Sequence, residues 1–174
     1  AWPDAAALWT FRDANSVVDS MLRKWADGFR EISHRVEAGQ DGTWDLEPLW
    51  DRIEAEAADL APGASGIDRT RDIYGLFWLY RNRLALDQAL AHHPRVVMAD
   101  YADFTRAPDA YLSQVMTLAG APPPRWRYPL VTRPASRDTS GKPRLSRAVQ
   151  ERCDALYVDL RTAAAGALNR VDAP

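Results

Sequence analysis

Two short apolar segments constrain the fold of this chain more than any other feature. AALWTF (6–11) and RVVMADY (95–101) are runs of mainly apolar residues that end in charge, which is typical of buried strands. The long stretch between them has helical periodicity, and strands joined by a helical crossover run parallel. We therefore predict an α/β fold with a parallel sheet. Because two strands make a poor sheet, we expect further strands upstream of Ala1.

Apolar spacing of three and four residues predicts the helices. We expect them at about 15–36, 44–61, 67–92, 108–118 and 146–168. Asp13, Asn15 or Ser16 can cap the first. The residues expected to point inward include Val17, Val18, Met21, Leu22, Trp25, Phe29, Ile32, Leu46, Leu49, Trp50, Ile53, Ile73, Phe77, Trp78, Tyr80, Leu84, Leu90, Val149, Cys153, Leu156, Tyr157 and Leu160.

Composition narrows the class of protein. A length of 174 residues, 47% hydrophobic and 26% charged, suits a single domain over 1–174, which we expect to be a fragment of a longer domain. The net charge of −2 does not indicate a nucleic-acid partner. A single cysteine, Cys153, excludes an internal disulfide and suits a reducing compartment, so we predict a cytoplasmic protein. No apolar segment approaches the ~20 residues of a membrane span.

Arg12 and Ser20 indicate an anion site. Arg12 directly follows the first predicted strand, and Ser20 lies eight residues later in the following helix. At the carboxyl end of a parallel strand, the next helix presents unpaired amides and the positive end of its dipole, and a guanidinium suits phosphate. The alternative is that Arg12 pairs with Asp13 or Asp19 and that Ser20 is a small packing residue.

The segment FRDANSVVDSMLRKW (11–25) resembles the 3′-phosphate-binding segment of sulfotransferases, which use 3′-phosphoadenosine 5′-phosphosulfate as sulfuryl donor. In that family a strand ends in Arg-Asp-Pro, and a serine follows eight residues after the arginine. Arg12, Asp13 and Ser20 match this pattern, whereas Ala14 stands in place of proline. The resemblance implies the P-loop-nucleotide-hydrolase-like sulfotransferase fold, of which this chain holds a helix-rich carboxyl-terminal part with about two parallel strands. It also implies that Arg12 and Ser20 bind the 3′-phosphate.

Two further stretches extend the resemblance. FWLYRNRLALDQALAHHPRVVMADYADFTRAPDAYLSQVMTLAGAP (77–122) is similar to the family's long helix, next strand and Tyr-Glu-Asp-Leu segment, with Ala102 and Phe104 as departures. Tyr101 then occupies the position of a tyrosine that contacts the donor nucleotide in some relatives. The basic loop 131–146 lies where the family brings a cationic loop over the nucleotide, which makes Arg137 and Lys142 candidates by location. A solvated surface loop is the alternative, since the loop lacks the Arg-Lys-Gly tripeptide of cytosolic relatives.

The family's phosphosulfate loop and catalytic base have no match among these residues. APGASG (61–66) follows a predicted helix and has no lysine, and His34, His92 and His93 read as surface residues rather than catalytic or metal groups. We therefore expect the catalytic residues upstream of Ala1, no metal, and no sulfuryl transfer by this chain alone.

The resemblance implies a sulfotransferase that transfers a sulfuryl group to a hydroxyl or amine acceptor, with this chain carrying the 3′-phosphate-binding part. Its partners would be the nucleotide cosubstrate and an acceptor, with no nucleic acid and no membrane span. One alternative is another nucleotide-binding P-loop-type transferase, such as a kinase. The other is a non-enzymatic helical interaction domain, with its aromatic residues as a binding groove and Arg12 in a structural ion pair.

Overall fold

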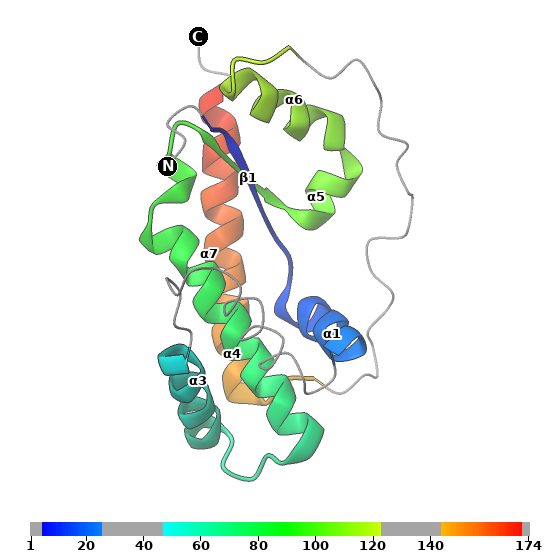
Figure 1. Cartoon of the computed structure of the whole chain (residues 1–174), viewed down its shortest axis with the longest axis vertical. Helices are drawn as coiled ribbons and strands as arrows, with labels where there is room; N and C mark the ends of the chain where they lie inside the picture. The colour runs from blue at the N-terminus through cyan, green and yellow to red at the C-terminus, as the bar shows by residue number, and fades with distance from the viewer. Residues whose placement is uncertain (1–4, 26–46, 123–143, 172–174) are drawn as a thin grey trace. The chain divides into compact units, whose positions relative to one another are not determined.

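The computed structural model describes residues 5–25, 47–122 and 144–171 (Figure 1). The elements in these ranges are, in chain order, β1 (Ala7–Phe11), α1 (Ala14–Trp25), α3 (Glu47–Leu60), α4 (Gly66–Asp87), the 3-10 helix η1 (Leu90–His92), β2 (Val96–Asp100), α5 (Tyr101–Arg106), α6 (Pro108–Leu118) and α7 (Arg147–Val171). Helices dominate, and the two strands pair with each other. The predicted α/β class is confirmed at this level.

The two strands run parallel, as predicted, in a register that places Ala7 opposite Val96 and Phe11 opposite Asp100. Phe11 and Asp100 are the last residues of their strands. Both strands therefore end at the same level, and the residues that follow them directly are Arg12 and Tyr101.

The described residues form two compact units, which we describe separately. The strand unit comprises residues 5–12, 82–122 and 156–171, and the helical unit comprises 13–25, 47–81 and 144–155. Each unit contains a part of α4 and a part of α7. Whether the whole chain behaves as the single domain expected from its length stays a prediction.

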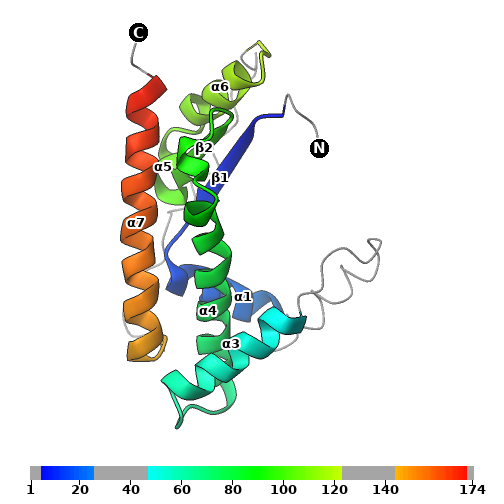
Figure 2. The same ribbon diagram turned by 90° about the vertical axis from the view of Figure 1, so that its left-hand side faces the viewer.

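The core of the strand unit lies between the sheet and α6. Successive side chains of a strand point to opposite faces, so Val97 and Ala99 share one face of β2, where they cluster with Tyr111 of α6. Leu8, Phe104, Val115 and Leu118 pack against this cluster. Both α5 and α6 contact the two strands, and Figure 2 shows β2 beside them. Met98 points to the other face and is also fully buried, as expected of a strand covered on both sides.

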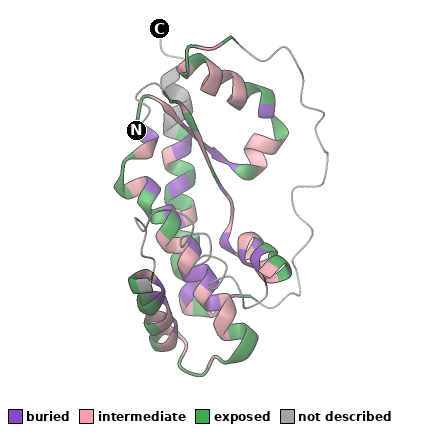
Figure 3. Cartoon of the chain, in the orientation of Figure 1, coloured by how far each residue is buried: buried purple, intermediate pink, exposed green. Residues whose placement is uncertain are grey.

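The core of the helical unit is built from the predicted apolar faces. Val18 and Met21 of α1 are buried, as are Trp50 and Ile53 of α3. The ring of Trp50 stacks on that of Phe77, with centroids 4.9 Å apart and planes 5° from parallel. In Figure 3 the buried residues of these helices alternate with exposed ones, as amphipathic helices require.

Gly75 allows α4 and α7 to approach each other closely within the helical unit. A Cβ atom at this position would lie 2.8 Å from Cδ2 of Leu145 and 3.0 Å from Cγ1 of Val149. The thiol of Cys153, one turn further along α7, donates to the carbonyl oxygen of Gly75 at 3.5 Å. The apolar residues predicted for the inner face of this part of α7, Val149 and Cys153, are both buried.

The structure corrects three details of the helices. Leu84 was expected to point inward, but it is 51% exposed, whereas its neighbours Asn82 and Ala85 are buried. The helix expected over 67–92 ends at Asp87, and the left-handed backbone of Ala89 (φ 50°) separates it from η1. Helix α5 was not predicted. It forms because the side chain of Asp100 accepts a hydrogen bond from the amide of Ala102 and so caps the helix.

Several sequence predictions fall outside the described residues. These include Phe29, Ile32, His34, Leu46 and most of the basic loop 131–146. His92 and His93 are exposed at the end of η1, as predicted. None of the helices in the described ranges combines the length and the hydropathy that crossing a bilayer requires.

Candidate functional site

The structure brings two predicted nucleotide-binding residues, Arg12 and Tyr101, into contact. They follow register partners at the ends of two neighbouring parallel strands. The Cζ atom of Arg12 lies 5.7 Å from the centroid of the Tyr101 ring, within the range of a cation–π interaction. Arg12 is half-buried, and Tyr101 is 39% exposed. The pair thus places a cation and a partly open aromatic ring at the carboxyl edge of the sheet.

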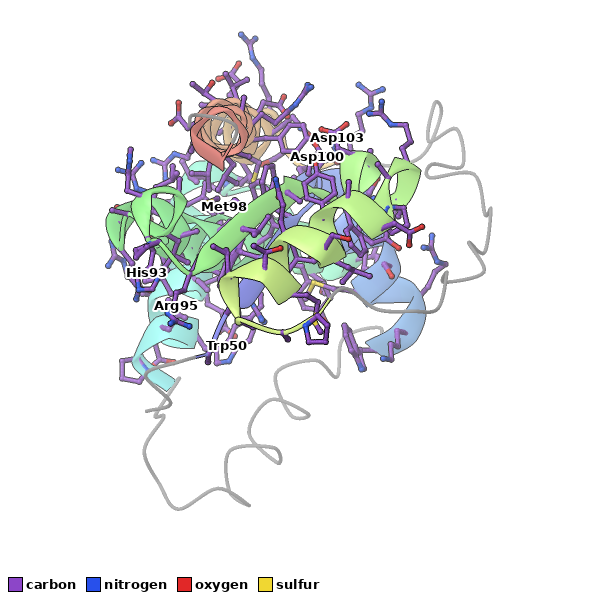
Figure 4. All side chains as sticks on the ribbon, turned by 90° about the horizontal axis from the view of Figure 1, so that it is seen from above. Trp50, His93, Arg95, Met98, Asp100 and Asp103 are labelled. Carbon is purple, nitrogen blue, oxygen red and sulfur yellow. The ribbon has the colours of Figure 1, made fainter. Side chains whose placement is uncertain are left out.

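Asp100 is a buried carboxylate directly beside this pair. It is 6% exposed and terminates β2. Its Oδ1 accepts a hydrogen bond from the amide of Ala102 at 2.8 Å, and its Oδ2 accepts one from the hydroxyl of Tyr157. The Nε of Arg161, one turn further along α7, lies 3.8 Å from the same Oδ2. Figure 4 shows Asp100 and Asp103 close together where β2 passes into α5.

Tyr157 contacts both strand ends. Its hydroxyl binds Asp100, and its ring meets the ring of Phe11 edge to face, with centroids 6.1 Å apart. Sequence reasoning placed Tyr157 on an inward helix face but assigned no role to it or to Asp100. The available signal was an acidic residue at the end of an otherwise apolar strand. The hydrogen bond between Asp100 and Tyr157 joins residues more than fifty positions apart, so no local sequence pattern predicts it.

Tyr111 is a packing residue in this part of the molecule. Burial raises the pKa of its phenol, and the negative charges of Asp103 and Asp100 raise this pKa further, against a lowering by Arg106. The ring packs edge to face against Phe104. Tyr111 therefore stays protonated at neutral pH and does not act as a base.

Ser20 lies in the helical unit, on the second turn of α1, with an exposed side chain. Of the three candidate caps, Asp13 is the residue that caps this helix, because its Oδ1 accepts the amide of Ser16 at 2.8 Å. One of the helix-end amides that we expected to be open to an anion is therefore bound by a carboxylate. The assignment of Ser20 to a phosphate stays a prediction.

Asp19, the neighbour of Ser20, belongs to an ion pair within the helical unit. Its Oδ1 lies 3.0 Å from Nη1 of Arg71, and the two side chains are 11% and 13% exposed. The alternative interpretation of the sequence, in which Arg12 pairs with Asp13 or Asp19, stays a prediction. The pairing with Arg71 gives Asp19 a structural role in joining α1 to α4.

The remaining candidates, Arg137 and Lys142, are outside the described residues. In the described ranges, no group of three His, Cys, Asp or Glu side chains is placed to hold a metal ion. Comparison of the chain with family models, with curated proteins and with solved structures found no match.

Proposed function

We propose that this chain forms the 3′-phosphate-binding part of a sulfotransferase-like domain that uses 3′-phosphoadenosine 5′-phosphosulfate. The observation that supports this most strongly is the contact between Arg12 and Tyr101 at the carboxyl ends of two adjacent parallel strands. Ligands of open α/β sheets bind at that edge. The resemblance of 11–25 and 77–122 to sulfotransferase segments assigns the same two residues to the donor nucleotide.

The chemistry of the pair suits a nucleotide. The guanidinium of Arg12 offers a planar set of donors that can bind two phosphate oxygens at once. The partly exposed ring of Tyr101 offers an aromatic surface beside it for a base or a ribose. Ser20 would add a hydroxyl to the same phosphate, as the resemblance implies. In this proposal Arg137 and Lys142, which lie outside the described residues, add positive charge, as the resemblance implies.

The role of these residues is binding rather than catalysis. In the proposed reaction, the acceptor oxygen or nitrogen forms a bond to sulfur while the bond from sulfur to the 5′-phosphate oxygen breaks. The acceptor proton passes to a base, and adenosine 3′,5′-bisphosphate leaves. Arg12 would hold the end of the donor that does not react, which distinguishes this nucleotide from ATP and positions the sulfuryl group.

The direct test is the Arg12→Ala variant, with nucleotide binding measured by titration calorimetry. Because a charge-assisted hydrogen bond contributes about 1.5–3 kcal/mol, affinity for adenosine 3′,5′-bisphosphate should fall about ten-fold or more. Affinity for 5′-AMP, which lacks the 3′-phosphate, should fall less. Arg106→Ala is the matched control. Arg106 ends α5, the helix that directly follows β2, but its side chain is exposed and pairs with Asp103. This control should bind both nucleotides as the unaltered protein does.

The outcomes separate the alternatives. Equal losses for both nucleotides would show that Arg12 supports the fold or another phosphate. A preference for magnesium ATP over adenosine 3′,5′-bisphosphate would favour a kinase-like transferase. Absence of nucleotide binding by the unaltered protein would favour a helical interaction domain. Sulfuryl transfer by residues 1–174, assayed with labelled donor and a panel of phenols and carbohydrates, would show that these residues do more than bind the nucleotide.

A further inference from the structure

We propose that Tyr157 is a positioning residue, which holds Arg12 and Tyr101 in the arrangement that the nucleotide requires. The inference takes its ligand from the proposed function. The contacts that support it do not depend on that function. Tyr157 contacts the residue that precedes each member of the pair, Phe11 before Arg12 and Asp100 before Tyr101.

The two residues that Tyr157 contacts lie opposite each other in the sheet. Phe11 and Asp100 are register partners and the last residues of β1 and β2. The Tyr157 ring packs edge to face on Phe11, while its hydroxyl donates to Oδ2 of Asp100. One side chain of α7 therefore touches both members of the last strand pair, so a shift of either strand end disturbs a contact with Tyr157.

The hydrogen bond to Asp100 is the part of this arrangement that controls Tyr101. The other oxygen of Asp100 caps α5 through the amide of Ala102, and Tyr101 is the first residue of that helix. With both oxygens bound, the carboxylate has one orientation. Without the Tyr157 hydroxyl, the charged Arg161 side chain, 3.8 Å away and 61% exposed, is left beside Oδ2. The Asp100 carboxylate can then turn toward Arg161. This turn weakens the cap of α5, so the Tyr101 ring is held less firmly against Arg12.

The test is Tyr157→Phe, which keeps the ring on Phe11 and removes only the hydroxyl. Affinity for adenosine 3′,5′-bisphosphate should fall about ten-fold, the size expected when a hydrogen bond to a charged group is lost and its effect reaches the ligand. Tyr80→Phe is the matched control. The hydroxyl of Tyr80 also donates to a carboxylate, that of Glu56, but in the helical unit. This control should leave nucleotide affinity unchanged.

A double-mutant cycle separates positioning from general destabilisation. If Tyr157 acts through the Arg12–Tyr101 pair, Tyr157→Phe should have little further effect on nucleotide affinity once Arg12 is replaced by alanine. If Tyr157 only stabilises the fold, the loss should be the same in both backgrounds. Equal losses would therefore overturn the inference.

A measurement without nucleotide keeps the inference separate from the proposed function. The Tyr101 ring should shift the NMR signals of the Arg12 side chain upfield through its ring current, because the guanidinium lies over that ring. Tyr157→Phe should reduce this shift, and Tyr80→Phe should not. If the protein binds no adenosine bisphosphate but the shift responds as expected, the proposed function fails and the positioning role stands. An unchanged shift in Tyr157→Phe overturns the positioning role whatever the nucleotide result.

Discussion

The two units each bury an aspartate, but the neighbours of these aspartates differ. In the helical unit, Asp72 of α4 is 1% exposed, and its Oδ1 accepts the amide of Ser146 at 2.8 Å, directly before α7 begins. In the strand unit, Asp100 caps helix α5, and it lies beside the partly exposed pair of Arg12 and Tyr101. A buried carboxylate is therefore not in itself a sign of a functional site. Its neighbours decide its role.

Other polar groups of the helical unit have the same structural character as Asp72. Glu56 of α3 accepts hydrogen bonds from Tyr80 of α4 and from Arg152 of α7. Burial raises the pKa of the Tyr80 phenol, and the hydrogen bond to Glu56 raises it further. Asn15 of α1 donates to Gln150 of α7 at 2.7 Å. These contacts join helices to one another, and we expect their loss to change stability rather than binding.

The largest effect should come from the core of the helical unit. Leu76 and Leu84 lie on the same helix, but Leu76 is fully buried and Leu84 is half exposed. Leu76→Ala should lower the free energy of unfolding by about 2–5 kcal/mol, because it removes buried methyl groups and leaves a cavity. Leu84→Ala should change it by less than about 0.5 kcal/mol. Denaturant unfolding measures both changes in stability. Equal losses would contradict the finding that Leu84 lies on an exposed side of α4.

The next effect tests the comparison of the two aspartates directly. Asp72→Ala leaves the amide of Ser146 without its acceptor and should cost about 2 kcal/mol of stability, with no change in affinity for adenosine 3′,5′-bisphosphate. Asp100→Ala should weaken that affinity about ten-fold, because it releases the cap of α5 and the Tyr157 hydroxyl. Calorimetry at a temperature where both variants are folded separates the two effects. Weaker nucleotide binding by Asp72→Ala would contradict the conclusion that Asp72 has only a structural role.

The smallest effect is a pH dependence in the helical unit. Burial raises the pKa of the Cys153 thiol from 9.0 to about 12, and the charges of Asp154 and Asp72 contribute. Between these values the unfolded chain loses the thiol proton and the folded protein keeps it, so stability falls as pH rises. We expect a loss of about 1 kcal/mol from about pH 8 to about pH 10.

Cys153→Ala removes this contribution and is the control. Other groups titrate at alkaline pH in both proteins, so the difference between the two stability curves isolates the thiol. The curve of Cys153→Ala should be flatter than that of the unaltered protein. Parallel curves would show that the thiol ionises in the folded protein near its ordinary pKa, and that α7 is packed less closely on α4 than the structure indicates.

Elements with a strong local signal could be predicted from the sequence. The strand segments 6–11 and 95–101 differ from β1 and β2 by only a residue or two at their ends, and α6 has the predicted bounds. Helix α5 escaped prediction, because its six residues carry no apolar period and its cap is the last residue of a strand. Leu84 was misplaced because apolar residues occur on more than one side of α4, and only packing selects the side that is buried.

For the candidate site, Arg12 was identified from its place directly after an apolar run. Tyr101 was identified from the resemblance to sulfotransferases, and the residues alone gave it no role. The contact between them was not visible without a structure, because it depends on the register that pairs Phe11 with Asp100. The role of Tyr157 was equally invisible, since its partners lie far from it in the chain.

The sequence by itself thus determined the order of the two strands and the longer helices and the parallel direction of the strands, because these depend on residue type and local periodicity. Only the tertiary structure decided that Asp13 rather than Asn15 or Ser16 caps α1, that Asp19 pairs with Arg71, and that Tyr157 binds Asp100. These choices depend on which groups meet when segments distant in sequence pack together. Each of these polar groups then binds the partner that packing brings within reach.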